Sequence, residues 1–210
     1  MKYQKQVDKS HYEFKNYMSK ERWASVWHQL DEIQKINPKN VLEIGPGLGL
    51  FKKLAATFNI NVETLDIDPD LDPDHLSPIT EMPFKDNSYD VVCAYQMLEH
   101  LPYETAIQAF KEMVRVCKKN LVISLPDAQL IWRYQIYIPK LGTKDFLIAR
   151  PRFKTPVHNF DGEHYWEINK RDYPLTKILT DFTVNINLLN TYRVKENPYH
   201  RFFIFEKKVS

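Results

Sequence analysis

Three of the chain's five glycines, Gly45, Gly47 and Gly49, lie within a span of five residues directly after the apolar run 41–44. Glycine suits a backbone that needs positive φ or that touches a ligand. A helix that begins after such a loop presents free backbone N–H groups to a bound ligand. The pattern predicts a ligand-binding turn that includes Pro46, and a tight strand-to-helix connection without a ligand is the alternative.

Two carboxylates flank this glycine loop. Glu43 lies two residues before Gly45, and Asp66 ends a second apolar run, residues 61–66, 17 residues after Gly49. Glu43 would repel a pyrophosphate but attract a ligand that carries an ammonium and a sulfonium. Asp66 stands where a carboxylate can accept hydrogen bonds from both hydroxyls of a ribose. A contact between Glu43 and a helix end or a backbone N–H is the alternative, but it leaves Asp66 unexplained.

Residues 158–167 combine two histidines, three acidic residues and three aromatic residues around one glycine. Aromatic side chains with a few polar groups suit a small-molecule pocket, and proton transfer near neutral pH favours histidine. We therefore take His164 and Glu163 as catalytic candidates. The substrate-binding candidates are His158, Tyr165 and Trp166. A packed cap whose polar groups satisfy one another is the alternative.

Glu99 and His100 follow a predicted strand, residues 89–94, so we expect them near the bound substrate. One interpretation is structural, with the pair bracing the helix that begins near Pro102. The other is that His100 acts as a general base and removes a proton from the substrate.

Composition fits one globular domain over residues 1–210, since 43% of the chain is hydrophobic and 27% is charged. The formal net charge of +2, from charges mixed along the chain, argues against nucleic-acid and anionic membrane partners. The Lys-rich start is expected to be a solvated arm. With two cysteines, no bilayer-spanning apolar run and no signal peptide after Met1, a cytoplasmic protein is expected.

Apolar periodicity predicts an alternation of strands and helices along residues 41–125. The predicted helices are residues 21–36, 48–58, 102–117 and 172–182, and the predicted strands are residues 41–44, 61–66, 89–94, 120–125, 184–194 and 201–207. Asp172 is predicted to cap the last helix, with Pro174 in its first turn. The loop between the two final strands is too short for anything but antiparallel pairing. The fold class is therefore α/β, a doubly wound Rossmann-like sheet, mostly parallel with a C-terminal antiparallel hairpin.

Three segments lie outside this regular pattern. Four prolines between residues 66 and 90 leave no room for a crossover helix, so a shortened loop with at most a stub of strand near Ile79 and Thr80 is expected. Residues 126–170 are aromatic-rich without a clean period and are expected to cap the substrate. Residues 1–36 are expected to be a helical segment that packs on the sheet. The expected packing residues on one face of helix 21–36 are Trp23, Trp27, Leu30 and Ile33. A lid over the ligand, formed by residues 10–28 with Tyr12 and Tyr17, is the alternative.

The spaced motifs together resemble the class I methyltransferases of the type 11 kind, which use S-adenosylmethionine (SAM). The resemblance covers residues 40–125 and is carried by Glu43-x-Gly45-x-Gly47-x-Gly49, LDIDP (65–69), PFKDNSYDVV (83–92) and LEHLP (98–102). It implies that Glu43 and the glycine loop hold the methionine part of SAM, and that Asp66 holds the ribose. Ile67 would pack beside the adenine, and Tyr95 and Gln96 would border the methionine part.

The chain departs from this family within residues 67–82, where relatives have a helix, a further strand and an aspartate that contacts adenine. Here the adenine contact is expected from Thr80, Glu81 or Met82. The spacing Gln96-x-x-Glu99-His100 also resembles the Glu-x-x-Glu-His metal site of some O-methyltransferases, with glutamine in place of one carboxylate. We expect no metal, and Glu99 and His100 are the residues that would hold one.

The resemblance implies methyl transfer from SAM to a small polar acceptor, at oxygen, with a sugar or another small metabolite as the acceptor. An NAD-type oxidoreductase is an alternative, although its Gly-x-Gly-x-x-Gly fingerprint would place the third glycine one residue later. A non-catalytic protein that binds SAM on the same fold is the other alternative.

Overall fold

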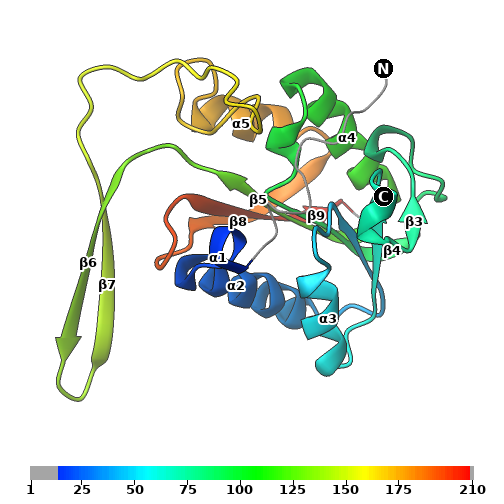
Figure 1. The fold of residues 1–210 in the computed structure, drawn as a ribbon, viewed down its shortest axis with the longest axis horizontal. Helices are drawn as coiled ribbons and strands as arrows, with labels where there is room; N and C mark the ends of the chain where they lie inside the picture. The colour runs from blue at the N-terminus through cyan, green and yellow to red at the C-terminus, as the bar shows by residue number, and fades with distance from the viewer. Residues whose placement is uncertain (1–13, 209–210) are drawn as a thin grey trace.

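The computed structural model describes residues 14–208 of the chain (Figure 1). Most of the Lys-rich start, and Tyr12 of the alternative lid, lie outside the described residues.

A seven-stranded sheet runs through the centre of the domain in the order β3-β2-β1-β4-β5-β9-β8 (Figure 1). Its strands are β1 (Val41–Ile44), β2 (Val62–Asp66), β3 (His75–Leu76), β4 (Tyr89–Tyr95), β5 (Cys117–Pro126), β8 (Ile186–Arg193) and β9 (His200–Lys207). Strands β1 to β5 are parallel to one another, whereas β9 runs antiparallel to both β5 and β8. The predicted mostly parallel sheet with an antiparallel C-terminal hairpin is confirmed.

Helices cover both faces of this sheet, and each face has its own apolar core (Figure 1). The helices are α1 (Phe14–Tyr17), α2 (Lys20–Ile36), α3 (Leu50–Thr57), α4 (Tyr103–Val116) and α5 (Leu175–Phe182). One core joins Ile33 of α2 and Phe51 of α3 to the strands. The other joins Phe110 of α4 and Phe182 of α5 to Phe203 of β9. Alternate strand residues point into opposite cores. Open α/β sheets of this kind bind ligands at the carboxyl ends of their parallel strands.

Helix α2 packs on the sheet as expected, but through a different set of side chains. Its buried residues are Ser25, Val26, Glu32 and Ile33. Trp23 and Trp27 are 51% and 57% exposed, so their predicted place on the packed face is wrong. Ser25 and Glu32 are polar residues on that buried face. Asn197 donates a hydrogen bond to Ser25, and Tyr192 donates one to Glu32, which satisfies them there.

The proline-rich segment after β2 has no crossover helix, as expected, and instead contains 3-10 turns at Pro69–Leu71 and Ile79–Glu81. The stub of strand is β3, which pairs with the end of β2, so its predicted place at residues 79–80 is wrong. Asp74 fixes the observed position. Its carboxylate accepts hydrogen bonds from the Thr64 backbone N–H at 2.7 Å and from the Lys52 ammonium at 2.6 Å.

The cap insertion contains regular structure that the sequence analysis did not predict. Strands β6 (Ile131–Ile138) and β7 (Gly142–Ala149) form a two-stranded antiparallel ribbon that projects from the domain (Figure 1). We call these two strands and their turn the ribbon. Beyond it, helix α5 begins after Pro174 rather than after Asp172, so the predicted cap residue is wrong.

Asp127 anchors the cap where β5 leaves the sheet. It is 1% exposed, and its carboxylate accepts hydrogen bonds from the Nε atoms of Arg193 and Arg201, both at 2.8 Å. Asn169, at the far end of the cap, donates a third hydrogen bond at 2.7 Å. A buried carboxylate with this many charged and polar donors ties the start and end of the cap to the strands β8 and β9.

Candidate active site

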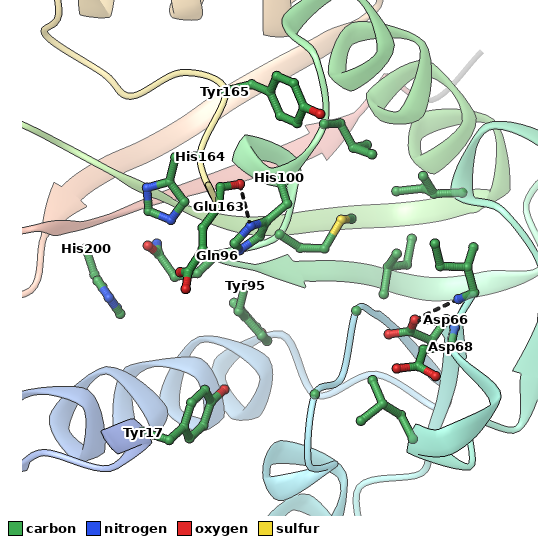
Figure 2. A pocket seen from close by; sticks show the side chains of 18 of the residues that line it. Tyr17, Asp66, Asp68, Tyr95, Gln96, His100, Glu163, His164, Tyr165 and His200 are labelled. Carbon is green, nitrogen blue, oxygen red and sulfur yellow. Dashed lines mark hydrogen bonds between the residues drawn. The ribbon is translucent and has the colours of Figure 1, made fainter. Parts of the chain in front are cut away.

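A cavity of about 1070 Å³ opens where β1, β2 and β4 end, at the carboxyl edge of the parallel strands (Figure 2). Asp66 and Asp68 lie at one end of it in Figure 2, and His164 and His200 lie toward the other. Open α/β sheets bind ligands at this edge, so the position agrees with the motifs.

The glycine loop forms part of the cavity wall through Gly45 and Gly47. Gly45 has a φ of +67°, and a Cβ at this position would lie 2.4 Å from Cγ of Met97, another wall residue. Any other residue would therefore displace the Met97 side chain and strain the backbone. Pro46 and Gly49 do not line the cavity; Gly49 instead precedes the first turn of α3.

Glu43 lies behind the glycine loop rather than on the wall. It is 4% exposed, and its Oε2 atom has no hydrogen-bond partner among the described residues. Burial raises the pKa of Glu43 to about 8, although the nearby Lys52 ammonium acts in the opposite direction. A buried acceptor without a donor beside a ligand-binding loop suits a positively charged ligand group.

Asp66 lines the cavity at the end of β2, together with Ile67 and Asp68. Its Oδ1 atom accepts hydrogen bonds from the backbone N–H groups of Ile67 at 2.7 Å and Asp68 at 2.9 Å, which fixes the carboxylate (Figure 2). Its other oxygen has no partner among residues 14–208. Burial raises the pKa of Asp66 above its ordinary value. A fixed carboxylate with one unused oxygen can accept hydrogen bonds from hydroxyl groups.

The wall beside Asp66 is completed by Ser77, Pro78 and Ile79 and not by the expected adenine-contacting residues Thr80, Glu81 and Met82. The predicted place of Thr80, Glu81 and Met82 on the cavity is wrong, because the 3-10 turn at Ile79–Glu81 carries the chain away from it. Met82 is buried in the core under α4, and its carbonyl accepts a hydrogen bond from Arg115 of that helix.

Tyr95 and Gln96 line the middle of the cavity, as expected. Gln96 has a φ of +52°, an uncommon value for a residue other than glycine, and its side chain donates a hydrogen bond to Ser124 at 3.2 Å. Backbone strain held in place by the surrounding structure is a feature of functional sites.

Several wall residues were not among the predicted site residues, although the alternative lid over residues 10–28 included four of them. They are Tyr17, Ser19, Glu21 and Arg22, which lie around the start of α2, and Asn197, Tyr199 and His200, which lie around the β8–β9 turn. The Arg22 guanidinium lies 4.2 Å from the centroid of the Tyr17 ring. The only signal for the first group was the aromatic density of residues 10–28, which suggested a lid.

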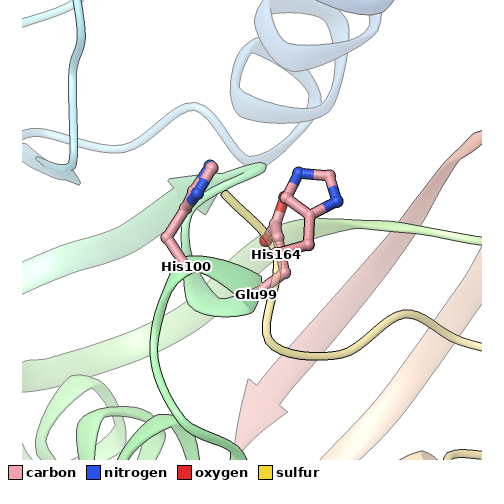
Figure 3. Close-up of side chains that lie close together, drawn as sticks. All are labelled: Glu99, His100 and His164. Carbon is pink, nitrogen blue, oxygen red and sulfur yellow. The ribbon is translucent and has the colours of Figure 1, made fainter. Parts of the chain in front are cut away.

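The rings of His100 and His164 lie edge to face, with their centroids 5.1 Å apart (Figures 2 and 3). Nδ1 of His100 lies 3.0 Å from the backbone carbonyl of Glu163, to which it donates a hydrogen bond. This contact leaves Nε2 of His100 as the acceptor nitrogen of a neutral ring. The Tyr165 N–H in turn donates to the Glu99 carbonyl at 2.9 Å, which holds the cap against the turn after β4.

His164 is paired with a buried carboxylate. Its Nδ1 lies 3.2 Å from Oε1 of Glu167. The same oxygen accepts a hydrogen bond from the Tyr199 hydroxyl, and Oε2 forms an ion pair with Lys170. Burial alone would raise the pKa of Glu167, but these donors lower it to about 2. Burial likewise opposes ionisation of His164, but Glu167 and neighbouring carboxylates raise its pKa above the ordinary value. The pair fixes the tautomer that leaves Nε2 of His164 as a proton acceptor.

Glu99 lies beside both histidines (Figure 3). It is fully buried, and neither carboxylate oxygen has a hydrogen-bond partner among the described residues. Burial raises the pKa of Glu99 to about 8. One ligand atom from each of Glu99, His100 and His164 lies within 4.8 Å of the other two. The cluster can therefore move a proton or hold a divalent cation.

Two expected substrate residues are not on the cavity wall. Trp166 is fully buried, and its indole N–H donates to the Leu101 carbonyl at 3.1 Å, so it belongs to the core and the prediction was wrong. Only 3% of the His158 side chain is exposed, and its Nε2 bonds the His164 carbonyl at 2.9 Å, which supports the cap instead. Glu163 and Tyr165 do line the cavity.

Comparison with known proteins agrees with this geometry. Residues 42–124 match the family model described as a methyltransferase domain. An uncharacterized protein from Methanocaldococcus jannaschii is 30% identical over 120 residues, which are 51% of this chain and 52% of that protein. The match thus spans about half the length of this curated relative.

Two solved structures share the fold over nearly the whole chain. The PH0226 protein from Pyrococcus horikoshii has a TM-score of 0.64 at 14% identity, over 96% of this chain and all of that one. The 1,6-didemethyltoxoflavin-N1-methyltransferase from Burkholderia thailandensis, solved with S-adenosylhomocysteine, has a TM-score of 0.61 at 12% identity, over 95% of this chain and 85% of that one. Residues 42–124 thus match a methyltransferase domain in sequence, and the chain shares its fold with solved proteins that include a SAM-dependent methyltransferase.

Proposed function

We propose that the chain transfers a methyl group from SAM to an oxygen atom of a small polar acceptor. The observation that carries the proposal is the position of His164, which is paired with Glu167 and lines the same cavity as the glycine loop and Asp66. A proton acceptor and a cofactor crevice that share one cavity are what O-methylation requires.

The residues present fit SAM at the strand edge. Glu43 would balance the positive charge of the methionine part, and the backbone of Gly45 and Gly47 would lie against it. Asp66 would accept hydrogen bonds from the ribose hydroxyls, with Ile67 beside the adenine. Bound SAM supplies a methyl group on a positively charged sulfur, which is already activated for displacement. The residues of this chain therefore need only align the acceptor and remove its proton.

His164 is the proposed general base. Its Nε2 would take the proton of the acceptor hydroxyl while the methyl group joins the oxygen, and Glu167 would stabilise the imidazolium that forms. His100, with Nδ1 held by the Glu163 carbonyl, would orient the acceptor through its Nε2. Glu163 stands beside these rings on the wall and is the remaining catalytic candidate.

The acceptor is proposed to be small because one cavity of about 1070 Å³ must hold it together with SAM. Phe160 and Tyr165, with ring centroids 4.5 Å apart, form an apolar patch on the wall of the cavity, which the polar groups of Asn197 and Tyr199 also line. An apolar ring face beside hydrogen-bonding groups suits a sugar or a comparable small metabolite.

A transfer assay tests this proposal. The chain is incubated with SAM labelled at the methyl group and with separate panels of sugars, small phenols, small amines and short RNA. Label transferred to an oxygen of a small hydroxyl compound supports the proposal. Label transferred only to nitrogen or only to RNA contradicts the proposed acceptor. Binding of SAM without transfer to any panel favours the non-catalytic alternative, and binding of NAD in place of SAM favours the oxidoreductase.

A metal-assisted reaction is the second candidate, because both oxygens of buried Glu99 lack donors next to His100 and His164. A divalent cation held by these three residues would lower the pKa of the acceptor hydroxyl and replace the general base. Activity that survives EDTA excludes this candidate. Activity that is lost in EDTA and restored by Mg²⁺ or Mn²⁺ supports it over a metal-free general base.

A further inference from the structure

The ribbon has one strongly apolar face. Side chains opposite one another in the antiparallel pair lie on the same face, which places Trp132 beside Ile148 and Tyr134 beside Phe146. Ile136 continues this face toward the turn, with Lys144 opposite it. The five large apolar side chains are each 45% to 53% exposed. The ribbon face defined by these five residues is called the apolar face below.

The opposite face of the ribbon is mixed, with polar Arg133, Gln135 and Asp145 among apolar side chains such as Leu147, and it is turned toward the domain. Asp145 bonds Arg133 at 3.3 Å and Gln135 at 3.1 Å across the two strands. Arg133 also donates a hydrogen bond to the backbone carbonyl of Glu196 in the body of the domain. Because successive strand residues point to opposite sides, the apolar face points away from the domain.

The ribbon projects from the domain and its strands pair only with each other, and the five side chains of the apolar face each keep about half of their surface exposed among the described residues (Figure 1). A two-stranded ribbon is only marginally stable in water unless its face packs on another surface. A continuous exposed patch of large apolar side chains marks an interaction site. The ribbon therefore has the properties of a docking surface.

The charge around the ribbon indicates what docks there. Residues 130–154 hold six Lys or Arg and a single acidic residue, whereas the whole chain has a net charge of only +2. The rest of the chain is thus net negative, and the positive charge is concentrated at the ribbon. Among the described residues, no ion pair is formed by Lys140, Lys144, Arg150 or Lys154, and all four are exposed.

This combination of an apolar face and exposed cations favours an anionic lipid surface over a second copy of the chain. Two copies that paired through their apolar faces would bring two sets of like charges together, which opposes association. An anionic bilayer attracts the same cations through its phosphate groups. Trp and Tyr side chains are also the residues that settle at the boundary between headgroups and acyl chains.

We infer that the ribbon docks the enzyme on an anionic lipid bilayer. The apolar face lies in the headgroup boundary with Trp132 and Tyr134, and the cations at the turn and after β7 contact lipid phosphates. No described helix is long and apolar enough to cross a membrane. The ribbon lies on the surface, because a two-stranded ribbon inside a bilayer would leave its edge N–H and C=O groups without partners.

Co-sedimentation with vesicles tests this inference directly. The full chain is mixed with phosphatidylcholine vesicles that contain or lack phosphatidylglycerol, at low and at high salt. Binding is expected only to the anionic vesicles, and it is expected to weaken steeply at about 1 M salt, where the Debye length is about 3 Å. Absence of binding to anionic vesicles at low salt contradicts the inference.

A matched pair of substitutions separates the two faces. Tyr134→Ser removes an aromatic ring from the apolar face and is expected to weaken vesicle binding about tenfold. Tyr137→Ser removes the same ring from the opposite face, where Tyr137 is 71% exposed, and is expected to leave binding within about twofold. Equal losses in the two variants contradict the assignment of the apolar face.

A second matched set tests the cations. Replacing Lys140, Lys144 and Arg150 together by Gln is expected to weaken binding about a hundredfold. Replacing the exposed body residues Lys85, Lys111 and Lys118 by Gln makes the same change in net charge and is expected to have a much smaller effect. Similar losses in both sets would show that net charge alone drives binding.

Two further measurements test whether a second copy of the chain or an RNA, in place of a bilayer, binds the ribbon. Sedimentation equilibrium that shows a dimer in the wild type and a monomer in Tyr134→Ser assigns the apolar face to a second copy and overturns the inference. Tight binding of a homopolymer RNA that displaces the vesicles overturns it as well. These results are independent of methyl transfer, so the inference and the proposed function can fail separately.

Discussion

The cavity and the ribbon use charge in opposite ways. The cavity region holds the buried carboxylates of Glu43, Glu99 and Glu167 and the half-buried one of Asp66, and it is proposed to bind a cationic cofactor. The ribbon presents exposed cations and apolar rings and is proposed to meet an anionic surface. A net charge of +2 summed over the chain conceals both features. Local placement of charge therefore says more about partners than the total does.

The cavity and the ribbon also differ in the contacts that fix their structure. Cores on both faces of the sheet surround the cavity, so a change of one side chain there disturbs a fixed geometry. The ribbon is held by its own cross-strand pairs and by Asp127 at its root. Substitutions in the cavity should thus change chemistry and cofactor binding, whereas substitutions on the ribbon should leave both intact.

The largest expected effect is on catalysis. His164→Ala removes the proposed base and should lower kcat about 10²- to 10⁴-fold in the transfer assay, with SAM affinity little changed. His75→Ala, which replaces a histidine away from the cavity, serves as the control. A kcat for His164→Ala equal to that of the wild type would remove His164 from the reaction and move the role of the base to His100.

A pH profile sharpens the same prediction. His164 acts as a base only when neutral, so kcat should fall as the pH drops through its raised pKa. Glu167→Gln removes the carboxylate that raises this pKa, and the acid limb of the kcat profile should therefore move to lower pH. An acid limb that does not move would show that Glu167 supports the cap without acting through His164.

The next largest effect is on stability. It is tested by comparing a substitution of Asp127, at the root of the ribbon, with one of Asp145, within the ribbon. Asp127→Ala leaves Arg193 and Arg201 without their buried partner and should lower the free energy of unfolding by about 3 kcal/mol. Asp145→Ala breaks the more exposed pair with Arg133 and should cost less than about 1 kcal/mol. Urea denaturation measures both, and equal losses would contradict the distinction between anchored root and free ribbon.

Proton release provides a further test of the cavity. With a pKa of about 8, Glu43 is mostly protonated at pH 7 before the cofactor binds. The positive charge of SAM favours the ionised form, so binding should release close to one proton and strengthen as the pH rises toward 8. Titration calorimetry in phosphate and in Tris, whose ionisation heats differ, measures this release. In Glu43→Gln the heats should no longer depend on the buffer, and a dependence that persists would assign the proton to another group.

The smallest expected effect comes from removing the ribbon. Replacing residues 131–149 by a short Gly-Ser linker should leave SAM affinity within about twofold of the wild type, because the cavity wall contains no residue of β6 or β7. The same deletion should abolish binding to anionic vesicles. A large loss of SAM affinity would show that the two regions are coupled and would break the comparison drawn above.

The sheet and the cofactor end of the cavity could be predicted because their signals are local. A short apolar run followed by closely spaced glycines specifies a strand, a turn and a helix, and Asp66 follows at a fixed distance. The acceptor end could not be predicted in this way. Arg22 and His200 reach the cavity from opposite ends of the chain, and no local pattern relates them. Trp166 was misassigned because the sequence around a tryptophan does not show whether its side chain packs in the core, as it does here, or lines a pocket.

The ribbon was missed although part of its signal was present. Trp132, Tyr134 and Ile136 alternate with Arg133 and Gln135, which is the period of a strand with one apolar face. Further apolar residues on either side blurred this alternation. The stub of strand after β2 was misplaced for a different reason, since the contacts of Asp74 with Thr64 and Lys52 decide its position and are not visible in the sequence.

Calorimetric titration of SAM into the wild type, Asp66→Ala and Asp70→Ala tests the central claim most directly. Asp70 is exposed and lies off the cavity wall, so its replacement should change the affinity by no more than about twofold. The wild type should bind SAM and not NAD, and Asp66→Ala should weaken SAM binding about 10- to 100-fold. Binding of NAD in preference to SAM, or an affinity for SAM that Asp66→Ala leaves unchanged, would contradict the account.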